Sequence, residues 1–542
     1  MRRLRQTHLG GTATDCLTIV DLASSAVRAE TSAQQHSAPS SARKPYILQL
    51  PDEILIAIVK FAARKSSSGA LHICNECLDT CRFSWDEHAT RPWDYHSLQT
   101  LSLVCRRFTK IAQPQLFRTI HFRTIHFRNL VPMVPPTIAV RRLYNTLRQN
   151  PHFQQHCRSI SIYIKNNEVG DGLPNNYIVA NHFARCLTRI RCLKIYGGFE
   201  NRGPRSCNES TWALIRLFVA YCRDIEHLQI SRWGSCLLPL DLLFKWLDFP
   251  KLKALSVHGI SHWEHGRLEL EPRMRRTAPF TSLIISSSKE RLEGISLLIQ
   301  WPALLTRVHF SGYGGRDEVM DYSTLEKLLL IHKDTLKYIA IQYIRLEDDS
   351  RVFNATLFPN LEFLELSRWD THPSSVHFRA DDVNVLGPKL KTFCWNFNVG
   401  GYESWTAFDE ASSLWISNLA NATVACNAAL RRIELRLCPR YSEPREETIY
   451  PWDLIDDLRD KVLRPKGIDL SYNDPPILKE KWREYLDSFK REALMDEGVD
   501  CSSQSRESSL ASEEDQSTES SEQAEYKGGY EGEDLRKYFI ST

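Results

Sequence analysis

Residues 361–366 read Leu-Glu-Phe-Leu-Glu-Leu, with leucines at the first, fourth and sixth positions. In an extended strand successive side chains point to opposite faces, so Leu364 and Leu366 would share one face. The same apolar spacing recurs in ten hexapeptides between residues 157 and 435. The fourth residues of these copies, called framework residues below, are Ile160, Leu193, Leu228, Leu255, Leu283, Val308, Ile339, Leu364, Phe393 and Ile433.

The spacing of these copies predicts a repeat array. Successive framework residues lie 25 to 40 residues apart, and helical patterns fill some of the gaps, as at residues 212–219, 325–330 and 414–419. This resembles a degenerate leucine-rich repeat, whose period is roughly 20–29 residues. A strand followed by a helix, repeated, builds a solenoid with a parallel sheet. A generic α/β domain is the alternative, which the recurring spacing disfavours.

Side chains that alternate with the framework residues are expected on the opposite, concave face of the sheet. They carry both charge signs and several aromatic rings, whereas a surface that tracks phosphates is expected to be more uniformly basic. The sequence therefore favours a protein target over nucleic acid. The predicted concave-face residues are Tyr163, Lys194, Tyr196, His227, Gln229, His258, Arg307, His309, Phe363, Glu365, Arg432, Glu434 and Arg436.

Two stretches near the N-terminus predict a small helical module. Residues 50–59 read Leu-Pro-Asp-Glu-Ile-Leu-Ile-Ala-Ile-Val. Pro51 suits the first position of a helix, and the two acids after it suit the first turn. Residues 98–108 read Leu-Gln-Thr-Leu-Ser-Leu-Val-Cys-Arg-Arg-Phe, with apolar residues at helical spacing and Arg106 and Arg107 on the other face. By periodicity alone, two core helices of an ordinary domain fit equally well.

These stretches resemble the F-box, a helical module that opens with Leu-Pro-x-Glu and closes with a Leu/Val-Cys-aromatic helix. The resemblance implies docking onto the Skp-type linker protein of a cullin–RING ubiquitin ligase. Here residues 65–97 make a longer link between the two halves than the family uses. The residues that the resemblance assigns to the core and linker-facing surface of the module are Leu50, Pro51, Ile54, Leu55, Ile58, Leu101, Val104, Cys105 and Phe108.

An F-box followed by irregular leucine-rich repeats is similar to a common class of fungal F-box protein, and the similarity covers roughly residues 46–440. It implies a non-catalytic adaptor that holds a target protein within reach of a ubiquitin-conjugating enzyme. The sequence has no phosphate loop, GxSxG elbow, HExxH helix or dinucleotide fingerprint, and it predicts no catalytic residue and no cofactor. The alternative is a leucine-rich-repeat scaffold without any link to ubiquitin.

Composition agrees with a large globular protein in a reducing compartment. The chain has 542 residues, of which 42% are hydrophobic and 25% charged, and its net charge is +3. Such a balance gives no strong bias toward nucleic acid or membrane. The 15 cysteines form no regular framework, which fits reduced thiols in cytoplasm or nucleus. No apolar run approaches the length that spans a bilayer.

The link between the two helical stretches contains a cysteine pair. Cys74 and Cys77 have CxxC spacing, and Cys81 and His88 would complete a tetrahedral set for zinc. No second CxxC follows, so incidental thiols are the favoured interpretation, and no metal site is assigned. A zinc-stapled enzyme built on this segment is the most remote alternative.

Composition also predicts the domain organisation. Residues 1–45 are expected to form a disordered arm, although early arginines and few acids would also suit a mitochondrial presequence. Residues 46–130 would hold the F-box, and residues 131–440 the solenoid. Residues 441–497 predict a helical cap over its last repeat. Residues 498–542, rich in serine and acids, predict a disordered tail.

Overall fold

The computed structural model describes most of the region from residue 50 to residue 488. The chain divides into two compact units, Met1–Leu486 and Asp487–Thr542, and every element below belongs to the first. The described residues are 50–62, 95–122, 138–164, 175–199, 208–231, 238–261, 270, 272–288, 292–313, 320–342, 351–367, 377–397, 408–437, 450–472, 478–484 and 487–488.

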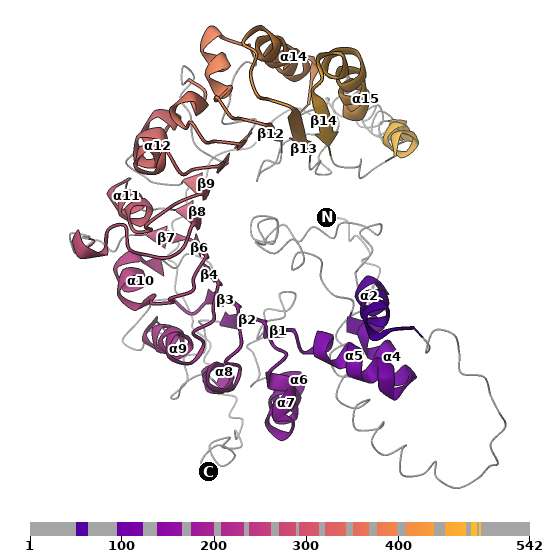
Figure 1. Ribbon diagram of the computed structural model, residues 1–542, viewed down its shortest axis with the longest axis vertical. Helices are drawn as coiled ribbons and strands as arrows, with labels where there is room; N and C mark the ends of the chain where they lie inside the picture. Colours follow the sequence, from indigo (N-terminus) through magenta and orange to yellow (C-terminus); the bar gives the residue numbers. More distant parts are fainter. Residues whose placement is uncertain are drawn as a thin grey trace, which may run out of the picture. The chain divides into compact units, whose positions relative to one another are not determined.

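A parallel sheet of twelve strands organises the fold, and its strands follow one another in chain order. The sheet is open and curved, with the helices on its outer side (Figure 1). The strands are β1 (Thr119–Phe122), β2 (Ser159–Ile164), β3 (Cys192–Gly197), β4 (His227–Ser231), β6 (Ala254–His258), β8 (Ser282–Ser288), β9 (Arg307–Tyr313), β10 (Tyr338–Gln342), β11 (Phe363–Ser367), β12 (Thr392–Asn396), β13 (Arg432–Arg436) and β14 (Asp469–Tyr472). A separate pair joins β5 (Leu238–Pro239) to β7 (Ile260–Ser261).

The strand register confirms the repeat pattern. All ten framework residues are Cα partners in one continuous row, from Ile160 on β2 to Ile433 on β13. Two more strands extend the row, with Ile120 opposite Ile160 and Leu470 opposite Ile433. The sheet therefore begins before and ends after the range 131–440 that the sequence predicts for the solenoid.

Helices and short helical turns connect the strands along the outer side (Figure 1). The helical patterns predicted at 212–219 and 414–419 lie within α9 and α14, and the pattern at 325–330 runs from α12 into the first residue of η3. The connecting elements are α6 (Ile138–Gln149), α7 (Pro151–Gln154), α8 (Asn175–Cys186), α9 (Asn208–Tyr221), α10 (Leu240–Trp246), η2 (Pro272–Met274), α11 (Leu292–Gln300), α12 (Tyr322–Leu329), η3 (Leu330–His332), η4 (Ala355–Leu357), η5 (Ala380–Val385), α14 (Glu410–Ala425), α15 (Pro451–Asp457), η7 (Leu458–Leu463) and η8 (Arg464–Lys466).

One hydrophobic core runs between the sheet and the helices, and it includes residues from Ile120 to Leu470. Each repeat buries its apolar face only against its neighbours, which is the way a solenoid is stabilised. Toward the C-terminal end the core is aromatic, because Trp415 of α14 packs on Trp395 of β12 with ring centroids 4.7 Å apart. The indole N–H of Trp415 donates to Asp382 at 3.0 Å, so this buried polar group is paired.

Two helices at the ends of the array show how local sequence sets their limits. Helices α6 and α7 are separated at Asn150, because Pro151 keeps this preceding residue out of helical conformation. At the other end, a helix at 479–484 places Trp482 in the core, 5.9 Å from the ring of Tyr450. The predicted cap is thus helical, but it also contains strand β14.

In the part of the chain that the structure describes, three helices precede the sheet: α2 (Asp52–Ala62), α4 (Tyr95–Val104) and α5 (Arg106–Leu116). We call them the three-helix module. The residues between α2 and α4, which include Cys74, Cys77, Cys81 and His88, lie outside the described part of the chain, as do the predicted arm 1–45 and the tail 498–542. Among the described helices, none has the length and apolar character needed to cross a membrane.

Candidate functional site

The three-helix module has a small core of its own. Leu55 and Val59 of α2 pack against Leu98 of α4 and against Phe108, Ile111 and Ala112 of α5. The spacing of Leu55 and Val59 is i, i+4, so both side chains leave the same face of α2. The two predicted helical stretches therefore fold against each other, although a segment of more than thirty residues separates them in the sequence.

The second predicted stretch is divided at Cys105. Its backbone is extended, with φ −164° and ψ 166°, so α4 ends at Val104 and α5 begins at Arg106. The hydroxyl of Thr109 donates to the carbonyl oxygens of Ser102 and Cys105 at 2.6 and 3.0 Å, which holds the two helices at the break. The apolar residues of 98–108 follow one helical spacing in the sequence, but in the structure they belong to two helices, α4 and α5.

The helical pattern places Arg107 on the face opposite the apolar residues, but in the structure its side chain is bound to α2 and to the residue before Pro51. Its Nε donates to the Asp52 carboxylate at 2.7 Å, and its Nη2 donates to the Leu50 carbonyl oxygen at 2.6 Å. The pair is partly exposed, so its contribution to stability is small. Its geometry nevertheless fixes the start of α2 against α5, which positions Pro51 and Ile54 at the module surface.

The structure sorts the nine predicted module residues into three groups by exposure. Leu55 and Phe108 are core residues. Leu50, Ile58, Leu101 and Cys105 are half-buried and pack against that core. Pro51, Ile54 and Val104 are exposed, Ile54 by 48% and Val104 by 59%.

One further exposed apolar residue, Leu103, was missed by the sequence analysis. It is 47% exposed and lies beside Val104 at the end of α4. In the helical pattern Leu103 lies outside the apolar face. Only the break at Cys105 shows that this end of α4 is exposed. We call Pro51, Ile54, Leu103 and Val104 the exposed apolar group of the module.

The concave face of the sheet forms the second candidate surface. Register places the predicted residues in rows that alternate with the framework row, as the strand geometry requires. On β3 the alternation is direct, because Leu193 and Ile195 are buried while Lys194 and Tyr196 are partly exposed. For Tyr163 only the backbone is described.

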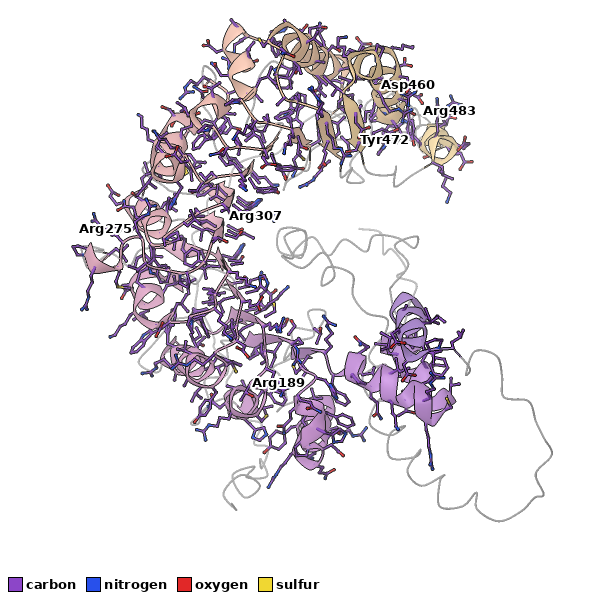
Figure 2. The ribbon with its side chains drawn as sticks, viewed as in Figure 1. Arg189, Arg275, Arg307, Asp460, Tyr472 and Arg483 are labelled. Atoms are coloured by element: carbon purple, nitrogen blue, oxygen red, sulfur yellow. The ribbon has the colours of Figure 1, made fainter. Side chains whose placement is uncertain are left out.

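A stack of planar groups crosses three neighbouring strands of this face. Arg307, Tyr338 and Phe363 occupy the same repeat position on β9, β10 and β11. The Arg307 guanidinium carbon lies 4.5 Å from the Tyr338 ring centroid, and the Tyr338 and Phe363 rings are parallel with centroids 4.3 Å apart. Figure 2 shows Arg307 on the inner side of the sheet. Tyr338 was absent from the sequence prediction, although its repeat position equals that of its two neighbours.

Next to this stack lies a buried carboxylate. Glu365 is fully buried and accepts hydrogen bonds from Gln342 Nε2 at 2.5 Å, Asn396 Nδ2 at 3.0 Å and Arg436 Nη1 at 2.6 Å. A buried charge requires such partners. The sequence placed Glu365 correctly on the concave face, but it did not predict its burial or the roles of Gln342 and Asn396.

Two other predicted concave residues are also buried, Gln229 and His309. Burial, together with the nearby positive charge of Arg436, lowers the pKa of His309 from 6.5 to about 3. His309 is therefore neutral at physiological pH. Burial also raises the pKa of the Tyr338 phenol. The centre of the concave face is thus a packed polar layer. The sequence placed these side chains on the concave face but did not predict that Gln229, His309 and Glu365 are buried there.

The predicted concave-face residues of β13, Arg432, Glu434 and Arg436, form ion pairs with different partners. Arg436 pairs with Glu365 and approaches Glu434 at 3.8 Å, whereas Arg432 pairs with Asp469 of β14 at 3.1 Å. Because Arg436 reaches across β12 to β11, its guanidinium is held in one place. A guanidinium fixed in this way is a preformed donor for a partner that lies on the concave face.

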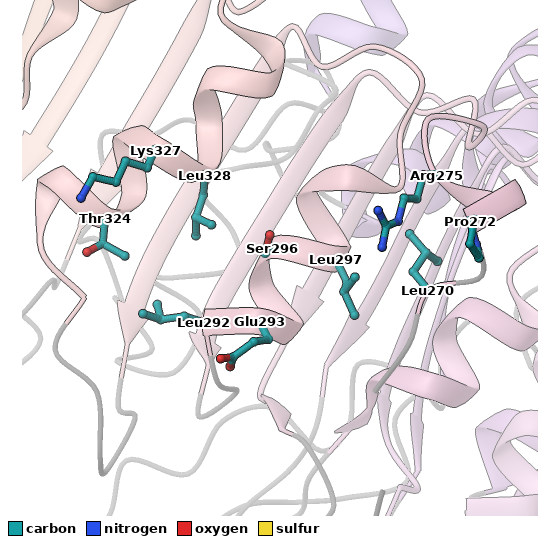
Figure 3. Close-up of a pocket in the computed structure, with 10 residues that line it drawn as sticks. All are labelled: Leu270, Pro272, Arg275, Leu292, Glu293, Ser296, Leu297, Thr324, Lys327 and Leu328. Carbon is teal, nitrogen blue, oxygen red and sulfur yellow. The ribbon is translucent and has the colours of Figure 1, made fainter. Parts of the chain in front are cut away.

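A pocket of about 710 Å³ lies on the helical side of the array (Figure 3). Four leucines and a proline line it together with two hydroxyl residues and three charged ones, Glu293, Arg275 and Lys327. Figure 3 shows these residues spread along η2, α11 and α12. Of the two hydroxyl residues in the lining, Ser296 accepts a hydrogen bond from Gln300 Nε2 at 2.8 Å. Among the described residues there is no group of three potential metal ligands.

Comparison with known protein families and with curated proteins found no match to this chain. The geometry of the two surfaces is therefore the basis for a function. One is a helix end that exposes apolar side chains, and the other is a concave sheet with a packed polar layer.

Proposed function

We propose that this chain is a substrate-recognition adaptor of a Skp–cullin–F-box ubiquitin ligase. The observation that carries the proposal is the three-helix module. The LPDEIL and LSLVCRRF stretches, which resemble the two ends of an F-box, pack on one core and leave Ile54, Leu103 and Val104 in water. Exposed groups of apolar side chains are a feature of protein interaction sites, and Leu103 and Val104 are adjacent exposed residues at the end of α4.

The proposed linker-facing surface is the exposed apolar group of the module. Burying one isoleucine or valine side chain against a partner gains about 1.5–3 kcal/mol. The Arg107–Asp52 pair keeps the start of α2 in place before the partner arrives, which reduces the ordering cost of association. Binding of the linker at this surface would explain why these apolar residues are not buried inside the module.

The proposed target-facing surface is the concave face around β9 to β13. The Arg307–Tyr338–Phe363 stack and the fixed guanidinium of Arg436 supply the residue types that anchor protein interfaces. The adaptor itself performs no chemistry in this proposal. It raises the effective concentration of the target's lysines near a charged ubiquitin-conjugating enzyme.

The direct test is co-purification of the full chain with a Skp-type linker protein. We expect stoichiometric binding by the wild type and its loss, by about a hundredfold or more, in Ile54→Asp/Val104→Asp. The matched control is Leu414→Asp/Val424→Asp. These side chains are exposed by 60% and 57%, at least as much as Ile54, but lie on α14 of the array.

Circular dichroism should show that both variants keep the wild-type fold, because all four positions are exposed. A wild-type chain that is folded and does not bind the linker would refute the adaptor proposal. The leucine-rich-repeat scaffold without a link to ubiquitin would then be the better account. Equal loss of binding in the control variant would refute the assignment of the surface.

A further inference from the structure

A regular row of residues borders the sheet at the edge where its strands begin. Each strand of the large sheet from β1 to β12 is preceded by one residue whose carbonyl oxygen accepts from two amides of the next repeat, as Arg158 does from Arg191 and Cys192 at 2.8 and 3.0 Å, and Arg431 before β13 accepts from the amide of Asp469 at 2.9 Å. These leading residues therefore have fixed backbone positions about 4.8 Å apart. They are Arg118, Arg158, Arg191, Glu226, Lys253, Thr281, Thr306, Lys337, Glu362, Lys391 and Arg431.

Further along this row, opposite charges neutralise each other. Lys253 of one repeat lies 2.8 Å from Glu226 of the preceding repeat, and Lys391 lies 2.7 Å from Glu362 in the same way. Just outside the row, Lys251 pairs with Asp224 at 2.6 Å. Alternating signs at neighbouring positions are what a structural ladder of surface ion pairs requires.

At the first three positions of this row the charges do not alternate, because all three leading residues are arginines. Arg118, Arg158 and Arg191 precede β1, β2 and β3, and Arg189 (Figure 2) lies two residues before Arg191. Among the described residues, the nearest ion pair that these four make is Arg191 to Glu226 at 3.9 Å. Glu226 is closer to Lys253, so its charge is shared.

The four arginines are close enough to repel one another. The pKa of Arg158 is lowered by burial first, and then by the charges of Arg191, Arg189 and Arg118. Its Nη1 donates to the carbonyl oxygens of Gln155 and Cys157 at 2.7 and 3.0 Å, which keeps the guanidinium at this edge. Like charges are therefore gathered at fixed positions, an arrangement that an anionic partner would relieve.

We propose that this arginine edge, formed by Arg118, Arg158, Arg189 and Arg191, binds an acidic segment of a partner protein. Guanidinium groups pair with carboxylates through two parallel hydrogen bonds, and a row of them accommodates a run of acidic side chains. The inference is independent of the proposed adaptor function, because it concerns a different surface.

The shortness of the row favours an acidic peptide over nucleic acid. Its leading arginines occupy three adjacent strands, a span of roughly 10 Å at the usual strand spacing, and the next leading residue is Glu226. A surface that follows a phosphate backbone is expected to be an extended basic stripe. The net charge of +3 gives no general attraction to polyanions.

The test is fluorescence anisotropy of a labelled oligoglutamate peptide titrated with the full chain, beside its oligoglutamine counterpart. We expect binding of the glutamate peptide only. In Arg189→Gln/Arg191→Gln it should weaken about tenfold, because two exposed guanidinium groups are lost. Arg158 is left intact because its side chain also supports the backbone.

The matched control is Lys337→Gln/Lys391→Gln, which removes the same charge from the same row at β10 and β12. We expect it to bind the peptide within about twofold of the wild type. An equal loss in both variants would mean nonspecific attraction and would overturn the proposal. So would the absence of binding, or tighter binding of a single-stranded oligonucleotide of equal charge.

Discussion

The three-helix module and the concave face of the sheet distribute polarity in opposite ways. In the module, the apolar Ile54 is 48% exposed, whereas on the sheet the charged Glu365 is fully buried. None of the large hydrophobic residues that are exposed in the described part of the chain lies in a strand of the sheet. The two regions therefore offer partners different chemistry, one apolar and one polar.

The size of each core explains the difference. Among the side chains that the structure describes, the core of the module consists of six residues, and such a small core leaves apolar side chains at helix ends in water. The array shares one core over all its repeats, so its framework row is fully covered. On its concave side the curvature brings side chains of several strands together, and polar groups bury one another there.

The largest effect should follow from removing a framework side chain. Leu364 is fully buried in the middle of the row, so Leu364→Ala should lower the free energy of unfolding by about 3 kcal/mol. Ile54→Ala removes a partly exposed side chain of similar size and should change it by less than about 0.5 kcal/mol. Urea unfolding monitored by tryptophan fluorescence would measure both. Equal effects would contradict the contrast between the regions.

A smaller effect is expected from the buried carboxylate. Glu365→Gln removes the charge that pairs with Arg436, and we expect a loss of about 2 kcal/mol, because one partner of a buried pair is left behind. The control, Glu362→Gln, lies on the same repeat but is exposed and pairs with Lys391. It should cost less than about 0.5 kcal/mol. If the two variants were equally stable, Glu365 would not act as a buried charge.

The smallest effect concerns pH. Unfolded His309 takes up a proton below pH 6.5, whereas the folded form does so only near pH 3. In between the unfolded state binds more protons, so the stability present above pH 6.5 is lost as pH falls. From about pH 7.5 to about pH 5.5 this contribution is about 1 kcal/mol.

His309→Gln should therefore reduce the acid sensitivity of the unfolding free energy by that amount. His377→Gln, at an exposed histidine, is the control. Thermal unfolding at the two pH values would measure the effect. An unchanged pH dependence in His309→Gln would show that His309 is accessible to protons in the folded chain, and the packed polar layer would then be an incorrect description.

The framework row was predictable because its signal is local and repeated. A strand can be predicted from alternating side chains alone, because successive residues point to opposite faces of the sheet. Ten copies with the same spacing then show which residues are neighbours across strands. Strand β1 was within reach as well, since Phe117-Arg-Thr-Ile-His-Phe has the same apolar spacing. In β14 the first apolar position is taken by Gly467, which adopts a positive φ of 71° before the strand, and the pattern is lost there.

The site was less predictable because its features depend on several segments together. Burial of Glu365 requires donors from β10, β12 and β13, which no single stretch encodes. The break at Cys105 is a backbone conformation, and helical spacing continues on both sides of it. The exposure of Val104 follows from that break, so the sequence named the residue without separating core from surface.

The proposed adaptor function requires the three-helix module to bind a Skp-type linker while the array remains available for a target. Hydrogen–deuterium exchange of the full chain, with and without a Skp-type linker, tests it most directly. The account predicts slower exchange in α2, α4 and α5 on adding the linker, and unchanged exchange in strands β9 to β13. Protection confined to the strands, or no protection anywhere, would contradict it.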